Sequence, residues 1–145
     1  MRTMNRTTRV LAGLAVAGLV LTGCTPSSAS APKEEAIHIE EQASGLKQLT
    51  LSAKAAERLG VETSPVAGSG STMSIPYAAL IYDAEGATWA YVTTEPLVYQ
   101  RAEVVVEAIE GDTATISEGP DAGTEVVTTG AAELYGAETG VGGGH

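Results

Sequence analysis

The chain has 145 residues and a net charge of −10; aromatic residues make up 4% of it, and it contains no phenylalanine. This length fits one small domain with flanking segments, and the composition predicts a core built mainly from Val, Ile, Leu and Ala. Without the first 23 residues the chain keeps 5 basic and 18 acidic residues, a net charge of −13, which argues against binding to nucleic acids or to anionic lipid headgroups.

The N-terminal residues predict an export signal. Met1–Arg9 is basic, and residues 10–21 (VLAGLAVAGLVL) carry no charge. A helix over that run spans roughly 18 Å, well short of the hydrocarbon core of about 30 Å. This is the length of the apolar region of a signal peptide and not that of a permanent membrane-spanning helix.

The residues that follow predict a lipid anchor. Leu21-Thr22-Gly23-Cys24 resembles the lipobox of bacterial lipoproteins. The resemblance implies that the thiol of Cys24 accepts diacylglycerol, that the peptide is cut ahead of this residue, and that the protein is held on the outer face of the cell membrane. A buried free cysteine after an ordinary signal is the alternative, but Cys24 precedes a polar stretch rich in Ser and Pro. As the only cysteine, it forms no disulfide within the monomer.

Composition divides the chain into four parts. We expect a lipoprotein signal peptide over 1–23, a lipidated flexible tether over 24–36, a β-domain over 37–140 and a disordered tail over 141–145.

The first half of the β-domain predicts strands on either side of one short helix. Leu46–Leu51 is expected to be a strand. Ser52–Gly60 reads as a helix with a serine N-cap and a C-terminal glycine. Val61–Val66 resumes as strand, and Gly68–Ser71 is expected to be a flexible joint.

Strands also dominate the second half. Residues 74–76 lead into a strand at 80–82, and Asp83–Gly86 forms a turn. Thr88–Val92 alternates, which places Trp89 and Tyr91 on one face of a strand. Core packing is the favoured interpretation of this pair, and a partner-docking surface is the alternative.

The rest of the domain continues this pattern. The expected elements are a long bulged strand over Leu97–Ile109, a turn at 110–112, a strand over Thr113–Ser117, a turn at 119–123, a strand over Thr124–Thr129 and a last helical turn at Ala131–Tyr135. Closely spaced strands with glycine-bearing turns predict a mainly β fold, a small antiparallel barrel or sandwich with one short helix.

The order of these elements resembles the membrane-proximal part of periplasmic adaptor subunits, or membrane-fusion proteins, of resistance-nodulation-division and heavy-metal efflux pumps. The resemblance runs over about residues 46–140 and rests on turn glycines and strand apolar residues. The stretches that carry it are 49–52, 55–63, 75–83, Gly86, 89–92, Arg101, Val104, Val106, 110–112, Ile116, Gly119, Gly123, 126–127, 130–131, 133–134 and Gly136.

This chain departs from the adaptor pattern at one point. A full adaptor inserts a helical hairpin, a lipoyl-like domain and a β-barrel domain between the two matching segments, whereas here only residues 67–72 separate Val66 from Met73. The resemblance therefore implies an accessory protein associated with a membrane transporter for efflux, without the reach of a tunnel.

Catalytic chemistry is not indicated. Both histidines, His38 and His145, fall in expected tails, whereas a nucleophilic site needs a histidine fixed in a packed scaffold. The carboxylate pairs at 83 and 85 and at 110 and 112 lie on turns beside glycine, where acidic residues are common for backbone reasons. We therefore expect no enzymatic activity and no cofactor.

Metal binding is the alternative function. His38 with Glu34, Glu35, Glu40 and Glu41 is a weak candidate site for a hard or borderline ion. Met73 is the only methionine after the predicted cleavage site, too few sulfur ligands for a soft cation. A solvated acidic tether is favoured, and a free-standing metal- or small-ligand-binding lipoprotein remains the second hypothesis.

Overall fold

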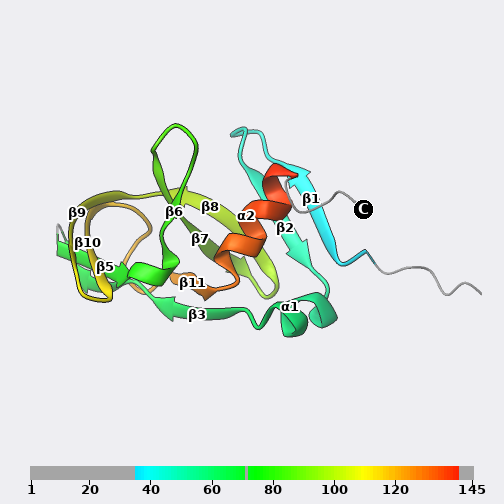
Figure 1. The fold of residues 1–145 in the computed structure, drawn as a ribbon, viewed down its shortest axis with the longest axis horizontal. Coiled ribbons are helices and arrows are strands. Elements are labelled where there is room, and N and C mark those ends of the chain that lie inside the picture. Colours follow the sequence, from blue (N-terminus) through cyan, green and yellow to red (C-terminus); the bar gives the residue numbers. More distant parts are fainter. Residues whose placement is uncertain (1–34, 71, 141–145) are drawn as a thin grey trace, which may run out of the picture. The chain divides into compact units, whose positions relative to one another are not determined.

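Two antiparallel sheets carry the fold in the computed structural model, which describes residues 35–70 and 72–140 (Figure 1). The predicted mainly β class is confirmed. The strands that the structure describes form a sheet of seven and a sheet of four and do not close into a barrel. The expected signal peptide, Cys24, most of the tether and the tail 141–145 lie outside the described residues.

The larger sheet contains the predicted strands on both sides of the helix. Its order in space is β1 (Ile37–Glu41), β2 (Lys47–Leu51), β8 (Val98–Glu103), β7 (Thr88–Glu95), β11 (Glu125–Thr129) and β3 (Glu62–Pro65), and β6 (Ile81–Tyr82) also pairs with β7.

The smaller sheet lies beside it within the same unit. Its order is β4 (Ala67–Ser69), β5 (Thr72–Pro76), β10 (Thr113–Glu118) and β9 (Val105–Glu110). A short 3-10 helix, η1 (Tyr77–Ala79), follows β5. The described residues form two α-helices, α1 (Ala53–Leu59) and α2 (Ala131–Thr139), so the prediction of one short helix is corrected to two.

At two of the places where the chain passes from one sheet to the other, a single valine separates the strands. Val66 separates β3 from β4, and Val104 separates β8 from β9. Both are almost fully buried, at 3% exposure each. The predicted single strand Leu97–Ile109 is therefore wrong: it is two strands in different sheets, broken at Val104 because that side chain turns into the core.

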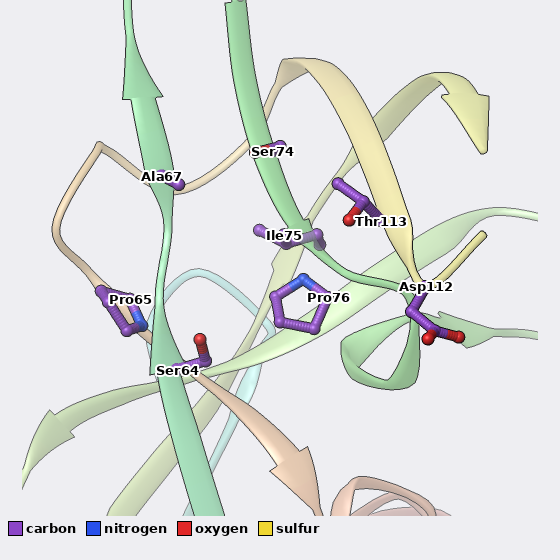
Figure 2. A pocket seen from close by; sticks show the side chains of 8 residues that line it. All are labelled: Ser64, Pro65, Ala67, Ser74, Ile75, Pro76, Asp112 and Thr113. Carbon is purple, nitrogen blue, oxygen red and sulfur yellow. The ribbon is translucent and has the colours of Figure 1, made fainter. Parts of the chain in front are cut away.

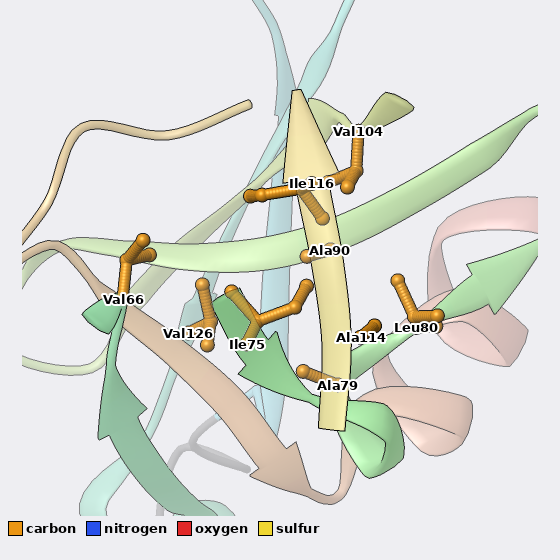
Figure 3. Close-up of a cluster of buried hydrophobic side chains, with 9 residues drawn as sticks. All are labelled: Val66, Ile75, Ala79, Leu80, Ala90, Val104, Ala114, Ile116 and Val126. Atoms are coloured by element: carbon orange, nitrogen blue, oxygen red, sulfur yellow. The ribbon is translucent and has the colours of Figure 1, made fainter. Parts of the chain in front are cut away.

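One core joins the two sheets (Figure 3). Ala114 and Ile116 of β10, both 0% exposed, face residues of the larger sheet such as Ala90 and Val126. The complete cluster is Val66, Ile75, Ala79, Leu80, Ala90, Val104, Ala114, Ile116 and Val126.

A second core lies on the other face of the larger sheet, under the two helices. Tyr91 and Leu134 are both 0% exposed within it. Its members are Leu49, Leu51, Ala55, Tyr91, Tyr99, Val127, Ala131 and Leu134. The alternation predicted for β7 thus sorts its residues between two cores, with Ala90 in the first and Tyr91 in the second.

Helix α1 forms where its local signals predict it. The Ser52 hydroxyl accepts a hydrogen bond from the Ala55 N–H at 3.2 Å, which satisfies an otherwise unpaired donor. Gly60 ends the helix with φ of 62°, a left-handed conformation that glycine adopts without steric cost. The predicted serine N-cap and the predicted C-terminal glycine of this helix are both confirmed.

Helix α2 extends further than the predicted turn Ala131–Tyr135. Ala131, Leu134 and Glu138 recur at helical spacing and form its buried stripe. Contacts made by Glu138 hold the last turn against the sheet, and the sequence segment alone does not reveal them.

The predicted flexible joint at Gly68–Ser71 is part of a hairpin in the structure. β4 pairs with β5 through Gly68 and Met73 and through Ser69 and Thr72. A Cβ atom at Gly68 would lie 2.2 Å from the Thr72 carbonyl oxygen, and its φ is 98°. Glycine is therefore required for the close approach of these two strands. Ser71 lies outside the described residues.

Candidate functional site

The predicted Trp89 and Tyr91 pair lies where β7 passes beneath α2. Tyr91 is 0% exposed, whereas Trp89 is partly exposed. Tyr91 is therefore unavailable to a partner, which corrects the docking alternative for this residue in favour of core packing. Around these two side chains the structure assembles the most elaborate polar cluster among the described residues, and we take this cluster as the candidate site.

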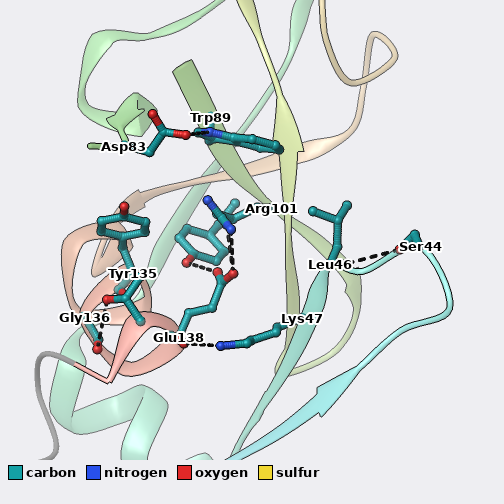
Figure 4. Close-up of polar contacts among 11 residues, drawn as sticks. Ser44, Leu46, Lys47, Asp83, Trp89, Arg101, Tyr135, Gly136 and Glu138 are labelled. Atoms are coloured by element: carbon teal, nitrogen blue, oxygen red, sulfur yellow. Dashed lines mark hydrogen bonds and ion pairs between the residues drawn. The ribbon is translucent and has the colours of Figure 1, made fainter. Parts of the chain in front are cut away.

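Glu138 is the centre of the cluster (Figure 4). Its side chain is 3% exposed. Oε1 accepts a hydrogen bond from Arg101 Nε and forms an ion pair with Arg101 Nη2, and each nitrogen lies 2.9 Å away. The Tyr91 hydroxyl donates to Oε2 at 2.5 Å. Both carboxylate oxygens are thus hydrogen-bonded, as a buried charge requires.

Two aromatic rings enclose the Arg101 guanidinium. Its central carbon lies 4.6 Å from the centroid of the Trp89 ring and 5.7 Å from that of Tyr135. Both distances are within the range of cation–π attraction. In addition, Lys47 Nζ donates to the backbone carbonyl of Glu138 at 2.8 Å, at the negative end of α2. Side chains from β2, β7 and β8 therefore converge on Glu138 in the last turn of α2, and those of Tyr91 and Arg101 bind its carboxylate.

The polar groups at the centre of the cluster are paired with one another. Burial, followed by the contact with Glu138, raises the pKa of Tyr91 far above its ordinary value of 10.0, so its phenol stays protonated. The Glu138 carboxylate is 3% exposed, and Arg101 and Tyr91 occupy its two oxygens. What the arrangement does is fix α2 on the larger sheet.

The sequence predicted a role for Trp89 and Tyr91 of this cluster but assigned none to Glu138. The signal that was available is the spacing of Ala131, Leu134 and Glu138, which places a carboxylate on an apolar helix stripe. A second signal is Arg101 itself, the last basic residue of the chain. A charged side chain on such a stripe needs a partner, and only the fold identifies Arg101 as that partner.

Asp83 extends the cluster at its solvent side. Its Oδ2 accepts a hydrogen bond from Trp89 Nε1 at 2.8 Å, which orients the indole over Arg101. Its Oδ1 accepts from the backbone N–H groups of Ala87 and Glu85 at 2.7 and 3.1 Å, respectively. The hydrogen bond from Trp89, helped by the backbone donors of the turn, lowers the pKa of Asp83 below its ordinary 3.8.

We expect this turn to contribute an acid-sensitive part of the stability. A carboxylate whose pKa is lower in the folded state stabilises the fold above its unfolded pKa, and the contribution is lost as the pH falls through the folded value. For Asp83 that window lies below 3.8. Asp83→Asn should therefore flatten the decline of the unfolding free energy on the acid side, as followed by chemical denaturation from about pH 7 to about pH 2.

Glu85→Gln is the matched control for this experiment. Glu85 is exposed in the same turn, and its side chain makes no hydrogen bond among the described residues. Its replacement should leave the acid-side slope as in the original chain. Equal slopes for Asp83→Asn and the original chain would contradict the assignment to Asp83.

His38 is part of strand β1 and not of a tail. It pairs with Thr50 in the sheet, and its ring nitrogens lie 3.7 Å from a Glu35 oxygen and 3.2 Å from a Glu40 oxygen. All three side chains are mostly exposed. Within residues 35–70 and 72–140 no three His, Cys, Asp or Glu side chains gather closely enough to hold a metal ion, and Glu34 lies outside this range.

A shallow pocket opens between the ends of the two sheets (Figure 2). Its volume is about 180 Å³, below the several hundred typical of small-molecule sites. The residues that line it are Ser64, Pro65, Ala67, Ser74, Ile75, Pro76, Asp112 and Thr113. None of the residues predicted as functional lies in it.

Comparisons of this chain with protein-family models, with curated proteins and with solved structures give no match. Among the helices that the structure describes, neither length nor apolarity suffices to cross a membrane. The resemblance to adaptor subunits therefore rests on the residues quoted for it above.

Proposed function

We propose that this chain is a lipid-anchored, extracytoplasmic accessory protein of a membrane transporter, and that it acts by recognition and not as an enzyme. One observation carries the proposal. The two segments that resemble the flanks of the adaptor membrane-proximal domain pair with each other: β2 with β8, and β3 with β11. Segments from both sides of the expected insertion point thus build one sheet, as a self-contained domain requires.

The segment between Val66 and Met73, where a full adaptor carries its inserted domains, supports an adaptor-like protein without those domains. In the family that the chain resembles, the inserted domains follow the segment that ends here at Val66. In this chain the β4–β5 hairpin closes that gap, and the contact between Gly68 and the Thr72 carbonyl leaves no room for a side chain. A module of this kind sits next to a transporter without extending toward a distant channel.

The anchor supports a position at the membrane. The first described strand begins at Ile37, a short stretch of sequence after Cys24. Two acyl chains on Cys24 hold a protein stably on a bilayer, where a single chain does not. The β-domain would therefore work within a short distance of the extracytoplasmic membrane surface.

The polar cluster supports recognition and not catalysis. Glu138, Arg101 and Tyr91 satisfy one another, so they offer no free nucleophile, base or acid to a substrate. What they supply is a rigid helix-on-sheet scaffold, and rigid scaffolds favour binding by shape.

Affinity capture tests the proposal. The full chain, tagged at its C-terminus, is expressed in its native membrane, crosslinked, solubilised in a non-ionic detergent and captured. A multi-spanning transporter subunit is expected in the captured fraction. The control carries residues 1–36 of this chain in front of an unrelated β-domain, so that both baits share the anchor and the tether.

Recovery of the transporter by both baits would assign the association to the anchor and overturn the role of the domain. Recovery of no transporter by the full chain, under conditions in which it remains lipidated by mass spectrometry, would overturn the proposed function.

A further inference from the structure

Strand β9 is an open edge of the smaller sheet. It pairs with β10 on one side, and no other described strand pairs with its outer side. The turn between the two strands consists of Gly111 and Asp112, with Glu110 opposite Thr113. In a two-residue hairpin that closing pair is hydrogen-bonded, so the next residue outward, Ile109, directs its backbone N–H and C=O away from β10.

The edge carries exposed apolar side chains. Val105 is 41% and Ile109 47% exposed, two of the five large hydrophobic residues that the described chain leaves open. An unpaired strand edge with apolar side chains is a ready template for another strand. The β9–β10 register shifts twice, near Glu107 and again between Val106 and Val105, and pairing is regular from Ala108 to Glu110.

Every charge around this edge is negative. Glu103, Glu107, Glu110 and Glu118 are exposed, and none forms an ion pair among the described residues. The chain has no Lys or Arg after Arg101 and none between Arg58 and Arg101, so the four strands of the smaller sheet contain no basic residue.

The negative charge of this edge favours some partner strands over others. A second copy of the chain would place the same glutamates opposite each other across the new strand pair, and like charges in that position destabilise a sheet. A segment with basic residues would instead bring opposite charge to Glu107 and Glu110 of β9, and its apolar residues would contact Val105 and Ile109.

We propose that the outer edge of β9 receives an extended, Lys- or Arg-bearing segment of a partner protein as an added strand. Main-chain hydrogen bonds supply the affinity, and the glutamates supply the selectivity for a basic segment. The proposal names the chemistry of a partner and holds whether or not that partner is a transporter, so its test is independent of membrane capture.

The test uses a synthetic peptide of about eight residues that alternates Lys and Val, matching the period of a strand. Its binding to the full lipidated chain in a non-ionic detergent is followed by fluorescence anisotropy. We expect saturable binding that weakens as the salt concentration rises. A peptide with Glu in place of Lys should not bind, and a peptide N-methylated at alternate residues should lose binding because it cannot complete the ladder.

Two charge-reversed variants locate the site. Glu107→Lys with Glu110→Lys should weaken binding of the Lys–Val peptide by about tenfold or more. Glu57→Lys with Glu133→Lys changes the net charge equally at exposed positions on the two helices, and should leave the affinity within about twofold of the original.

Absence of peptide binding overturns the proposal. Equal binding by the N-methylated peptide, or equal weakening by both double variants, also overturns it, because either result reduces the interaction to attraction by net charge alone.

Discussion

Replacing Glu138 by alanine should lower the free energy of unfolding by about 3 kcal/mol. Removal of the carboxylate leaves the Arg101 guanidinium without its counter-charge and the Tyr91 hydroxyl without its acceptor. The Arg101 side chain is only 18% exposed, so water compensates for little of the loss. The measurement is the urea midpoint at neutral pH, with the far-ultraviolet signal reporting whether α2 is retained.

Glu133→Ala is the control for this prediction, because Glu133 lies exposed in the first turn of the same helix. Its replacement should change the stability by no more than about 0.5 kcal/mol. The double variant Arg101→Met with Glu138→Leu should regain the part of the loss that comes from the unpaired guanidinium, since an apolar pair of similar size replaces a buried ion pair at little cost. The part that comes from the Tyr91 hydroxyl remains, because its acceptor is still absent. A Glu138→Ala variant as stable as Glu133→Ala would show that the contacts of Glu138 do not hold α2.

Replacing Ile116 by alanine should lower the free energy of unfolding by about 2–5 kcal/mol. Ile116 is 0% exposed and lies in the core that joins the two sheets. Its loss removes buried apolar area and leaves a cavity between β10 and the larger sheet, which the surrounding backbone fills only in part. Chemical denaturation of the full chain in detergent gives the change directly.

Ile109→Ala is the matched control, because it deletes the same side chain from the neighbouring strand where that side chain is 47% exposed. The expected loss is below about 1 kcal/mol. Similar losses for Ile109→Ala and Ile116→Ala would contradict the placement of the core. For binding of the Lys–Val peptide we expect the opposite ranking of the two variants. Ile109→Ala should weaken peptide binding more than its small loss of stability explains, because Ile109 lies on the proposed docking edge.

The two hydrophobic cores stabilise different parts of the fold. The core under the helices, with the contacts of Glu138, makes the larger sheet a rigid platform. The core between the sheets holds β10, and through β10 the open edge of β9, at a fixed place on that platform. An edge held in this way meets a partner strand without first having to be ordered, which reduces the entropic cost of binding.

The sequence predicted correctly those helices and turns that depend only on neighbouring residues. The serine cap and terminal glycine of Ser52–Gly60 define α1 because a helix end needs a donor satisfied and a left-handed residue. The turn predicted at 110–112 and the strand predicted over Thr113–Ser117 define the β9–β10 hairpin in the same way. Both are confirmed because neither depends on a distant part of the chain.

The long strand predicted over Leu97–Ile109 marks the limit of this reasoning. An apolar run gives no sign that Val104 leaves one sheet for another, because the side chain that causes the break is accommodated by residues far away in sequence. The joint predicted at Gly68–Ser71 failed for a related reason. Glycine and serine fit a flexible linker and a tight hairpin equally well, and the pairing of Gly68 with Met73 decides between them.

By itself the sequence determined the mainly β class, the capped helix, the turns and the acidic character of the chain, because composition, period and capping act over a few residues. The tertiary structure alone decided that Tyr91 is buried, that Arg101 meets Glu138 across 37 positions of sequence, and that β9 forms an edge. Those features depend on which strands become neighbours, and neighbours are chosen by the packing of the whole chain.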